Sequence, residues 1–172
     1  KINAPASGIN GLEFWNLKIS GNGGNDSTVD LSGSVGGVYN VKVKNCNFDG
    51  NNESRKCWYG NYMGGVWEWD NCRLHNFNHW YLIDSTQSST FPNQIPNDPN
   101  GYLSDFSMTN CHVYDCKGTM AIRGGGGNSS THMRKPLNTC TFSNNYIDYT
   151  RTSSSDDMAW AALEINTRRA VM

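Results

Sequence analysis

The chain has 172 residues, of which 17% are charged and 18 are glycine, and its formal net charge at pH 7 is −1. This length suits a single domain, and the balanced charge excludes the basic stripe that a nucleic-acid-binding surface needs. No apolar run approaches the roughly 18–20 residues of a membrane-spanning helix, so we expect neither nucleic acid nor a membrane span among the features of this protein.

The first 22 residues contain the unit from which the rest of the chain is built. Asn16 is its centre, and apolar side chains stand four and two residues before it and one and three residues after it, at Leu12, Phe14, Leu17 and Ile19. Alternating apolar positions predict a short strand with one buried face on each side of the asparagine. The alternation shifts by one residue at Asn16, so the chain must bend there, and asparagine tolerates the left-handed conformation that such a bend needs.

The same frame recurs along the chain around Asn45, Asn71, Asn110 and Asn144, at intervals of 26 to 39 residues. A strand-forming unit that repeats at such intervals, with insertions of variable length, is typical of a stacked repeat array. In such an array each asparagine lies above the next, and we expect the five side-chain amides to bond to one another as an Asn ladder.

This pattern, with an asparagine ladder in its tight turn, resembles the right-handed parallel β-helix of pectate-lyase-like enzymes and phage tailspikes. The resemblance covers nearly the whole chain and implies an all-β, single-stranded solenoid of about five coils. It also implies a third strand in each coil, for which the candidates are residues 29–32, 57–60, 81–84, 120–123 and 163–166. In the naming used for this family, these strands form the first sheet, the strands before each asparagine the second, and those after it the third.

The two ends of the chain suggest a piece of a longer solenoid. A coil begins at Leu12, and residues 168–172 read as the start of another second-sheet strand. We therefore expect residues 1–172 to be a single β-helix domain truncated at both ends. Further coils, or partner chains as in a homotrimer, would cover the open ends.

Three of the six cysteines, Cys46, Cys72 and Cys111, share the position after the asparagine, and Cys140 is also at an inward position. We expect them to be buried, with free thiols that pack as small apolar groups, although a disulfide between adjacent coils is open as an alternative. No Cys-x-x-Cys pair occurs, so neither a metal site nor a cofactor is implied. Glycosylation sequons at residues 25–27, 52–54 and 128–130 permit an extracellular eukaryotic origin.

The outward positions of the second sheet predict a ladder of opposite charges, with Glu13 beside Lys42 and Lys44 beside Asp70. Trp67 and Trp69 fall at inward positions instead, where the preceding coil has small residues, so we assign them to the core rather than to a sugar-binding platform. The candidates for exposed aromatic side chains are Trp15, Trp58 and Trp80.

The first sheet carries the main candidate site. Asp84 and Arg123 stand at the ends of neighbouring strands, Glu164 lies beside them, and the two longest insertions, residues 85–101 and 124–138, follow these strands. Long insertions between regular strands are usually functional, for example as the walls of a binding groove. Two carboxylates suit glycoside hydrolysis, and a carboxylate with an arginine suits lyase chemistry on a uronate. The alternative is a structural Asp84–Arg123 ion pair.

Two other groups of residues complete the candidates. His79, Trp80 and Trp58 would bind substrate at the rim of the first-sheet groove, the tryptophans by stacking on sugar rings. On the third sheet, Asp49, His75 and Tyr114 are an alternative acid–base set, because a carboxylate can orient a histidine and tune its pKa. The alternative is that these three residues form a hydrogen-bonded row on the surface and have no catalytic role.

These patterns lead to two hypotheses of function. The first is an extracellular protein, secreted or on a cell or virion surface, that recognises an acidic or complex polysaccharide and cleaves it by lyase or hydrolase chemistry. The second is a non-catalytic structural or adhesive shaft of a virion fibre, tailspike or surface filament. The resemblance favours the first sheet as the substrate face, but the chain has neither the aspartate cluster of the pectate-lyase calcium site nor a matching catalytic motif.

Overall fold

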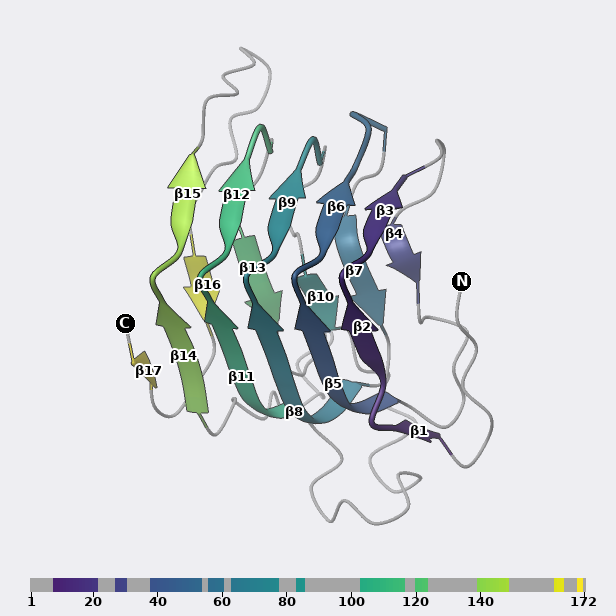
Figure 1. Ribbon diagram of the computed structural model, residues 1–172. Helices are drawn as coiled ribbons and strands as arrows, with labels where there is room; N and C mark the ends of the chain where they lie inside the picture. The colour runs from purple at the N-terminus through teal and green to yellow at the C-terminus, as the bar shows by residue number, and fades with distance from the viewer. Residues whose placement is uncertain are drawn as a thin grey trace, which may run out of the picture.

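The computed structural model is an all-β arrangement of parallel strands in three stacked sheets (Figure 1). It describes residues 8–21, 27–30, 38–53, 56–60, 63–77, 83–85, 103–116, 120–123, 139–148, 163–165 and 170–171. Within these ranges every strand pairing is parallel.

The second sheet contains β1 (Ile9–Asn10), β2 (Glu13–Trp15), β5 (Val38–Lys44), β8 (Met63–Asp70), β11 (Leu103–Thr109), β14 (Thr139–Ser143) and β17 (Ala170–Val171). The third sheet contains β3 (Lys18–Ser20), β6 (Asn47–Asp49), β9 (Arg73–His75), β12 (His112–Tyr114) and β15 (Tyr146–Asp148). The first sheet contains β4 (Ser27–Asp30), β7 (Lys56–Gly60), β10 (Ile83–Ser85), β13 (Met120–Arg123) and β16 (Leu163–Ile165).

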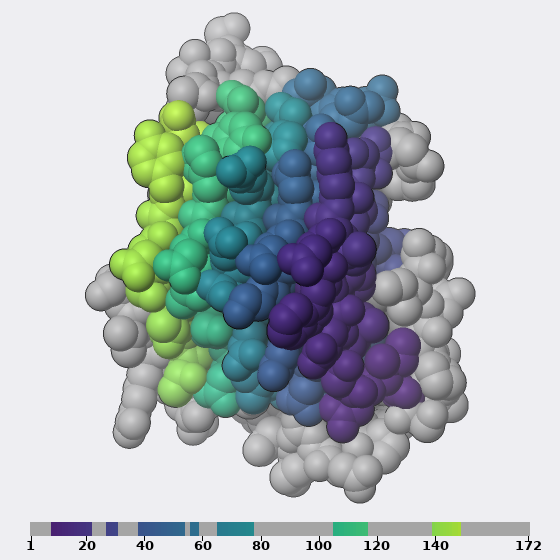
Figure 2. Space-filling view, viewed as in Figure 1, coloured from purple at the N-terminus to yellow at the C-terminus, as the bar shows by residue number. Residues whose placement is uncertain are grey.

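From β4 to β9 the chain passes through the first, second and third sheets in turn and then repeats the cycle. Successive passes lie side by side across the molecule, as the colour gradient of the space-filling view shows (Figure 2). This order fits a parallel β-helix, in which each pass stacks on the one before. The strands expected before and after each asparagine are confirmed as members of the second and third sheets.

The bend at each asparagine is also confirmed. All five central asparagines have positive φ angles between 53° and 56°, in the left-handed region that the one-residue shift in alternation predicts. Asn45 Nδ2 donates to Asn16 Oδ1 at 3.1 Å, and Asn71 Nδ2 donates to Asn45 Oδ1 at 2.8 Å.

Beyond Asn71, the prediction of a continuous ladder is wrong. Asn110 Nδ2 donates to Asp70 Oδ1 at 2.9 Å. The carboxylate of Asp70 is a stronger acceptor than the neutral amide of Asn71, because a hydrogen bond to a charged group is charge-assisted. In the following coil the side chain of Asn145 bonds to the backbone. Its Oδ1 accepts from the Cys111 amide and its Nδ2 donates to the Met108 carbonyl, both at 2.8 Å.

The interior is a column of large apolar side chains. Trp67 and Trp69 are fully buried, which confirms their assignment to the core. Trp58 is fully buried as well, and its ring lies 5.4 Å and 5.5 Å from those of Trp67 and Trp69 in edge-to-face contacts. The prediction that Trp58 is exposed and stacks on sugar is therefore wrong. The physical reason is its register, because β7 places Trp58 between Val29 and Ile83 in the inward row of the first sheet.

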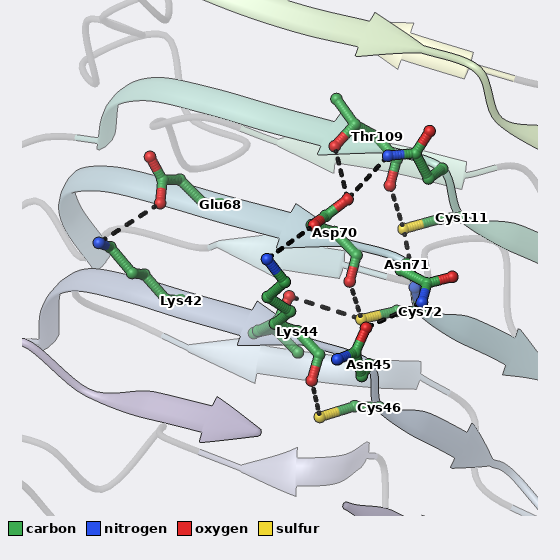
Figure 3. Close-up of polar contacts among 12 residues, drawn as sticks. Lys42, Lys44, Asn45, Cys46, Glu68, Asp70, Asn71, Cys72, Thr109 and Cys111 are labelled. Atoms are coloured by element: carbon green, nitrogen blue, oxygen red, sulfur yellow. Dashed lines mark hydrogen bonds and ion pairs between the residues drawn. The ribbon is translucent and has the colours of Figure 1, made fainter. Parts of the chain in front are cut away.

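The four cysteines expected in the interior, Cys46, Cys72, Cys111 and Cys140, are free and buried, and so are Cys57 and Cys116, whose burial was not predicted. The thiols of Cys46, Cys72 and Cys111 each donate to the carbonyl oxygen two residues earlier, at 3.2 to 3.3 Å (Figure 3). Burial raises the pKa of the Cys57 thiol and raises the pKa of Cys140 to about 11. These side chains therefore act as packing groups in the interior, in agreement with the sequence-based expectation.

Candidate functional site

The register of the first sheet brings the three predicted catalytic positions to one face. Asp84 is paired with Arg123, and Glu164 is paired with Ala121, two positions before Arg123. Trp58 is inward and pairs with Ile83, the residue before Asp84. Because alternate residues of a strand lie on opposite faces, Asp84, Arg123 and Glu164 occupy positions on one and the same face of the first sheet.

The same register extends this row to the earlier strands. Asp84 pairs with Tyr59, which pairs with Asp30. The first of these strands was expected over residues 29–32 and is found at Ser27–Asp30, two residues earlier. By standard strand spacing, the Cα positions of Asp84 and Glu164, two strands and two residues apart, are separated by about 12 Å.

The strand register does not locate the residues predicted to form the rim of this groove. His79 and Trp80 lie outside the described residues, as do most of the two long insertions. The first sheet therefore places the backbone positions of Asp84, Arg123 and Glu164 on neighbouring strands, close to one another.

The alternative set on the third sheet is brought together as predicted. Asp49 pairs with His75, and His75 pairs with Tyr114. The rings of His75 and Tyr114 stack with centroids 4.7 Å apart and planes 9° apart. Stacked rings cover each other's faces, so this pair presents no free aromatic face between the two strands.

Both ring nitrogens of His75 are engaged. Its Nε2 lies 2.9 Å from Asn47 Oδ1, and its Nδ1 lies 2.9 Å from Asn76 Nδ2. An amide oxygen only accepts and an amide nitrogen only donates, so Nε2–H donates to Asn47 and Nδ1 accepts from Asn76. This is a neutral imidazole. Desolvation lowers the pKa of His75 below its ordinary 6.5, against the opposing effect of Asp49 and Asp115.

Asp49 completes this network. Its Oδ1 accepts from Asn76 Nδ2 and from the Asn51 amide, each at 2.9 Å, and lies 3.6 Å from His75 Nδ1. Desolvation acts to raise the pKa of Asp49, but the hydrogen bonds from Asn76 and Asn51 outweigh it, and the pKa is below the ordinary 3.8. A neutral histidine with no free nitrogen beside an ionised, hydrogen-bonded carboxylate suits a hydrogen-bonded row on the surface better than acid–base catalysis.

The second sheet carries two ion pairs between strands, and one of them, the Lys44–Asp70 pair, is as predicted. Glu13 lies beside Lys42 in register as expected, but Lys42 pairs with Glu68. Lys42 Nζ lies 3.8 Å from Glu68 Oε2, and Lys44 Nζ lies 3.4 Å from Asp70 Oδ2 (Figure 3). Asp70 also accepts from Asn110 Nδ2 and from Thr109 Oγ1, and these contacts, the Asn110 hydrogen bond foremost, lower its pKa. Exposed pairs of this kind contribute about 0–1 kcal/mol each to stability.

One feature of this face was missed by sequence reasoning. A surface hollow of about 180 Å³ is lined by Trp15, Lys42, Val43, Lys44, Glu68 and Asp70. Trp15 had been named as an exposed aromatic residue, and its side chain is 49% exposed. The signal that could have located the hollow is Trp15 itself, because the corresponding positions of the later coils hold the smaller or polar residues Lys44, Asp70, Thr109 and Ser143.

Among the described residues, no group of three or more His, Cys, Asp or Glu side chains could hold a metal ion. In the same part of the chain there is no helix with the length and apolar character to cross a membrane. The chain was compared with protein-family models, curated proteins and solved structures, and no match was found. Since a fold does not by itself determine function, the function has to be inferred from the arrangement of the side chains.

Proposed function

We propose that this chain is a right-handed, single-stranded parallel β-helix of about five coils that recognises an extended extracellular polysaccharide over its first sheet and cleaves it there. The observation that carries this proposal is the register, in which Asp84 pairs with Arg123 and Glu164 pairs with Ala121 two positions away. The right-handed form follows the strong general preference of parallel crossover connections.

The proposed chemistry uses these three side chains in one of two ways. In a lyase, a carboxylate removes the proton α to a uronate carbonyl, Arg123 stabilises the developing negative charge, and the glycosidic C–O bond breaks as a C=C bond forms. In a hydrolase, Asp84 and Glu164 act as acid and base while water adds across the glycosidic bond. His79 and Trp80 would bind the sugar at the rim.

The test is turnover of a polysaccharide panel by the wild-type chain and by Asp84→Asn and Arg123→Ala, followed by reducing-sugar and ultraviolet assays. We expect cleavage by the wild type and a loss of at least about 100-fold in Asp84→Asn, as is usual when an acid–base group is removed. A lyase should also lose activity in Arg123→Ala, because that variant lacks the cation that stabilises the developing negative charge. Asp148→Asn, on the third sheet, is the matched control and should retain activity. Ultraviolet absorbance would identify a lyase, and its absence a hydrolase.

A second candidate function is a non-catalytic structural or adhesive shaft of a virion fibre, tailspike or surface filament. The observation in its favour is that polar side chains on the second and third sheets bond to one another between strands, as in Lys44–Asp70, His75–Asn47 and Asn76–Asp49. If no panel polysaccharide is cleaved and glycan arrays show no binding, the shaft replaces the enzyme. Sedimentation would then show whether the chain forms a homotrimer.

A further inference from the structure

The hollow on the second sheet differs from the charge ladder around it by an exposed aromatic side chain. Four of its six lining residues belong to that ladder, and the half-exposed indole of Trp15 is added to them; Val43 is 1% exposed and contributes little surface. The aliphatic stems of Lys42 and Lys44 supply further apolar surface beside the indole, because lysine buries its methylenes while its ammonium group stays in water. Apolar surface with a few polar groups around it is the usual composition of a small-molecule site.

The rim of the hollow is polar but balanced. Lys42 and Lys44 contribute two ammonium groups, and Glu68 and Asp70 contribute two carboxylates, so the formal charge of the lining is zero. Each ammonium group already faces a carboxylate, at 3.8 Å for Lys42–Glu68 and 3.4 Å for Lys44–Asp70 (Figure 3). An anionic ligand would meet the carboxylates and a cationic one the ammonium groups, so the hollow suits a neutral ligand rich in hydroxyl groups.

Trp15 supplies the element that such a ligand needs. The Lys44 ammonium group lies over its ring, 5.8 Å from the centroid, but the residue is still 49% exposed, so much of the indole surface remains open to solvent. An indole carries a large apolar surface that is normally covered. A pyranose ring has C–H groups on its faces and hydroxyl groups around its edge, so it can cover the indole and bond to Glu68, Asp70 and Lys42 at the same time.

We propose that this hollow is a binding subsite for one neutral pyranose unit of a glycan. Its volume of about 180 Å³ is below the range of roughly 300–1,000 Å³ of sites for drug-sized ligands and suits a single sugar ring. The subsite lies on the second sheet and does not depend on the catalytic proposal for the first sheet. It would hold a polysaccharide on a side of the coil away from the point of cleavage.

The experiment uses the whole chain and three neutral probes, methyl β-glucopyranoside, methyl β-galactopyranoside and methyl α-mannopyranoside, with methyl β-glucuronide as the charged probe. Binding is followed by the NMR signals of the tryptophan indole N–H groups during titration into the millimolar range. We expect the Trp15 signal, assigned by its loss in Trp15→Phe, to shift in a saturable way with at least one neutral probe. The buried indoles of Trp58, Trp67 and Trp69 are internal controls and should not shift.

Two variants sharpen the result. Glu68→Gln removes a rim carboxylate without changing its shape and should weaken binding by about tenfold, the loss expected for one charge-assisted hydrogen bond. Tyr146→Ala removes another exposed aromatic side chain, 61% exposed on the third sheet, and should leave binding unchanged.

Three outcomes would overturn the proposal: no saturable shift with any neutral probe, equal loss of binding in Tyr146→Ala, or tighter binding of the glucuronide than of the neutral glycosides. None of these outcomes concerns Asp84 or Arg123. The subsite and the catalytic groove can therefore fail separately.

Discussion

At the scale of single residues, His75 shows how a side chain that resembles a catalytic base can instead hold the coil together. Its two nitrogens bond to Asn47 on the preceding coil and to Asn76 next to it in the chain. Only the neutral ring satisfies both contacts, because protonation would set the new Nδ1–H against the N–H donor of Asn76. Protonation of His75 therefore disfavours the folded state, and the free energy of unfolding depends on pH.

The sign of that dependence follows from the direction of the shift. The folded state lowers the pKa of His75 from 6.5, so the unfolded chain binds more protons and stability falls as the pH falls below about 6.5. We expect the free energy of unfolding between pH 7.5 and 5 to have a smaller slope in His75→Gln than in the wild type, the difference being at most about 1.4 kcal/mol per pH unit. Chemical denaturation at several pH values measures it.

NMR of the imidazole nitrogens provides the control for this prediction. At neutral pH the ring should be the Nε2–H tautomer, and its titration midpoint should lie below 6.5. A midpoint above 6.5, or an Nδ1–H tautomer, would contradict the hydrogen-bond assignment. Asp49 adds a separate effect at lower pH: its pKa is below 3.8 in the fold, so its contribution is present above that pH and is lost in stronger acid.

At the scale of the structural elements, the asparagine bend combines backbone strain with a side-chain bond. Asn71 has a φ of 53° and donates to Asn45. Asn71→Ala loses the bond, at about 1 kcal/mol, and also places a Cβ-bearing residue without a local side-chain hydrogen bond in the left-handed region, at a further 1–2 kcal/mol or so. Asn71→Gly loses the bond but tolerates the conformation, so it should be destabilised by about 1 kcal/mol and the alanine variant by about 2–3 kcal/mol.

Urea unfolding of the two variants measures this difference, and Asn144 is the matched control. Asn144 has the same φ of 53° and makes no side-chain hydrogen bond to another described residue. Asn144→Gly should therefore cost less than Asn71→Gly. Equal destabilisation of Asn71→Ala and Asn71→Gly would show that the backbone conformation contributes nothing at this bend.

The bends also show which elements can be predicted from sequence. The asparagine bend is visible because strict alternation on both sides reveals the one-residue shift. A second bend, at the start of the second sheet, uses Gly11, Asn40 and Gly65 at positive φ and was missed. There Asn40 Nδ2 donates to Asn10 Oδ1, and the register between β5 and β8 is irregular at that point, so no constant spacing marks it in the sequence.

Trp58 was misplaced for a related reason. Cys57 and Trp58 are adjacent and both buried, so β7 does not alternate and the inward face cannot be read from it. The register of Trp58 with Val29 and Ile83 decides the question, and pairing across coils is information that one strand does not contain. The hollow beside Trp15 depends in the same way on three neighbouring strands, β2, β5 and β8.

At the scale of the whole molecule, the three sheets enclose an interior in which inward residues of successive coils stack on one another. Cys46, Cys72 and Cys111 occupy one such row, and each lies within the buried core. A row of small, polarisable side chains lets successive coils approach closely at the bend. In the extracellular location proposed above, accessible thiols would be oxidised. Burial is therefore what keeps these cysteines in the thiol form.

We therefore expect the six thiols to be free but inaccessible in the native protein. Burial raises the pKa of Cys57 above 9.0 and that of Cys140 to about 11, so little of the reactive thiolate of these two residues is present at neutral pH. For all six thiols, burial in the core restricts access of a reagent. Titration with a chromogenic disulfide reagent should give almost no fast reaction in buffer and six thiols per chain in denaturant, without prior reduction. Fewer than six thiols in denaturant would mean that adjacent coils are cross-linked, and a fast reaction in buffer would mean that the end coils open readily enough to expose their interior.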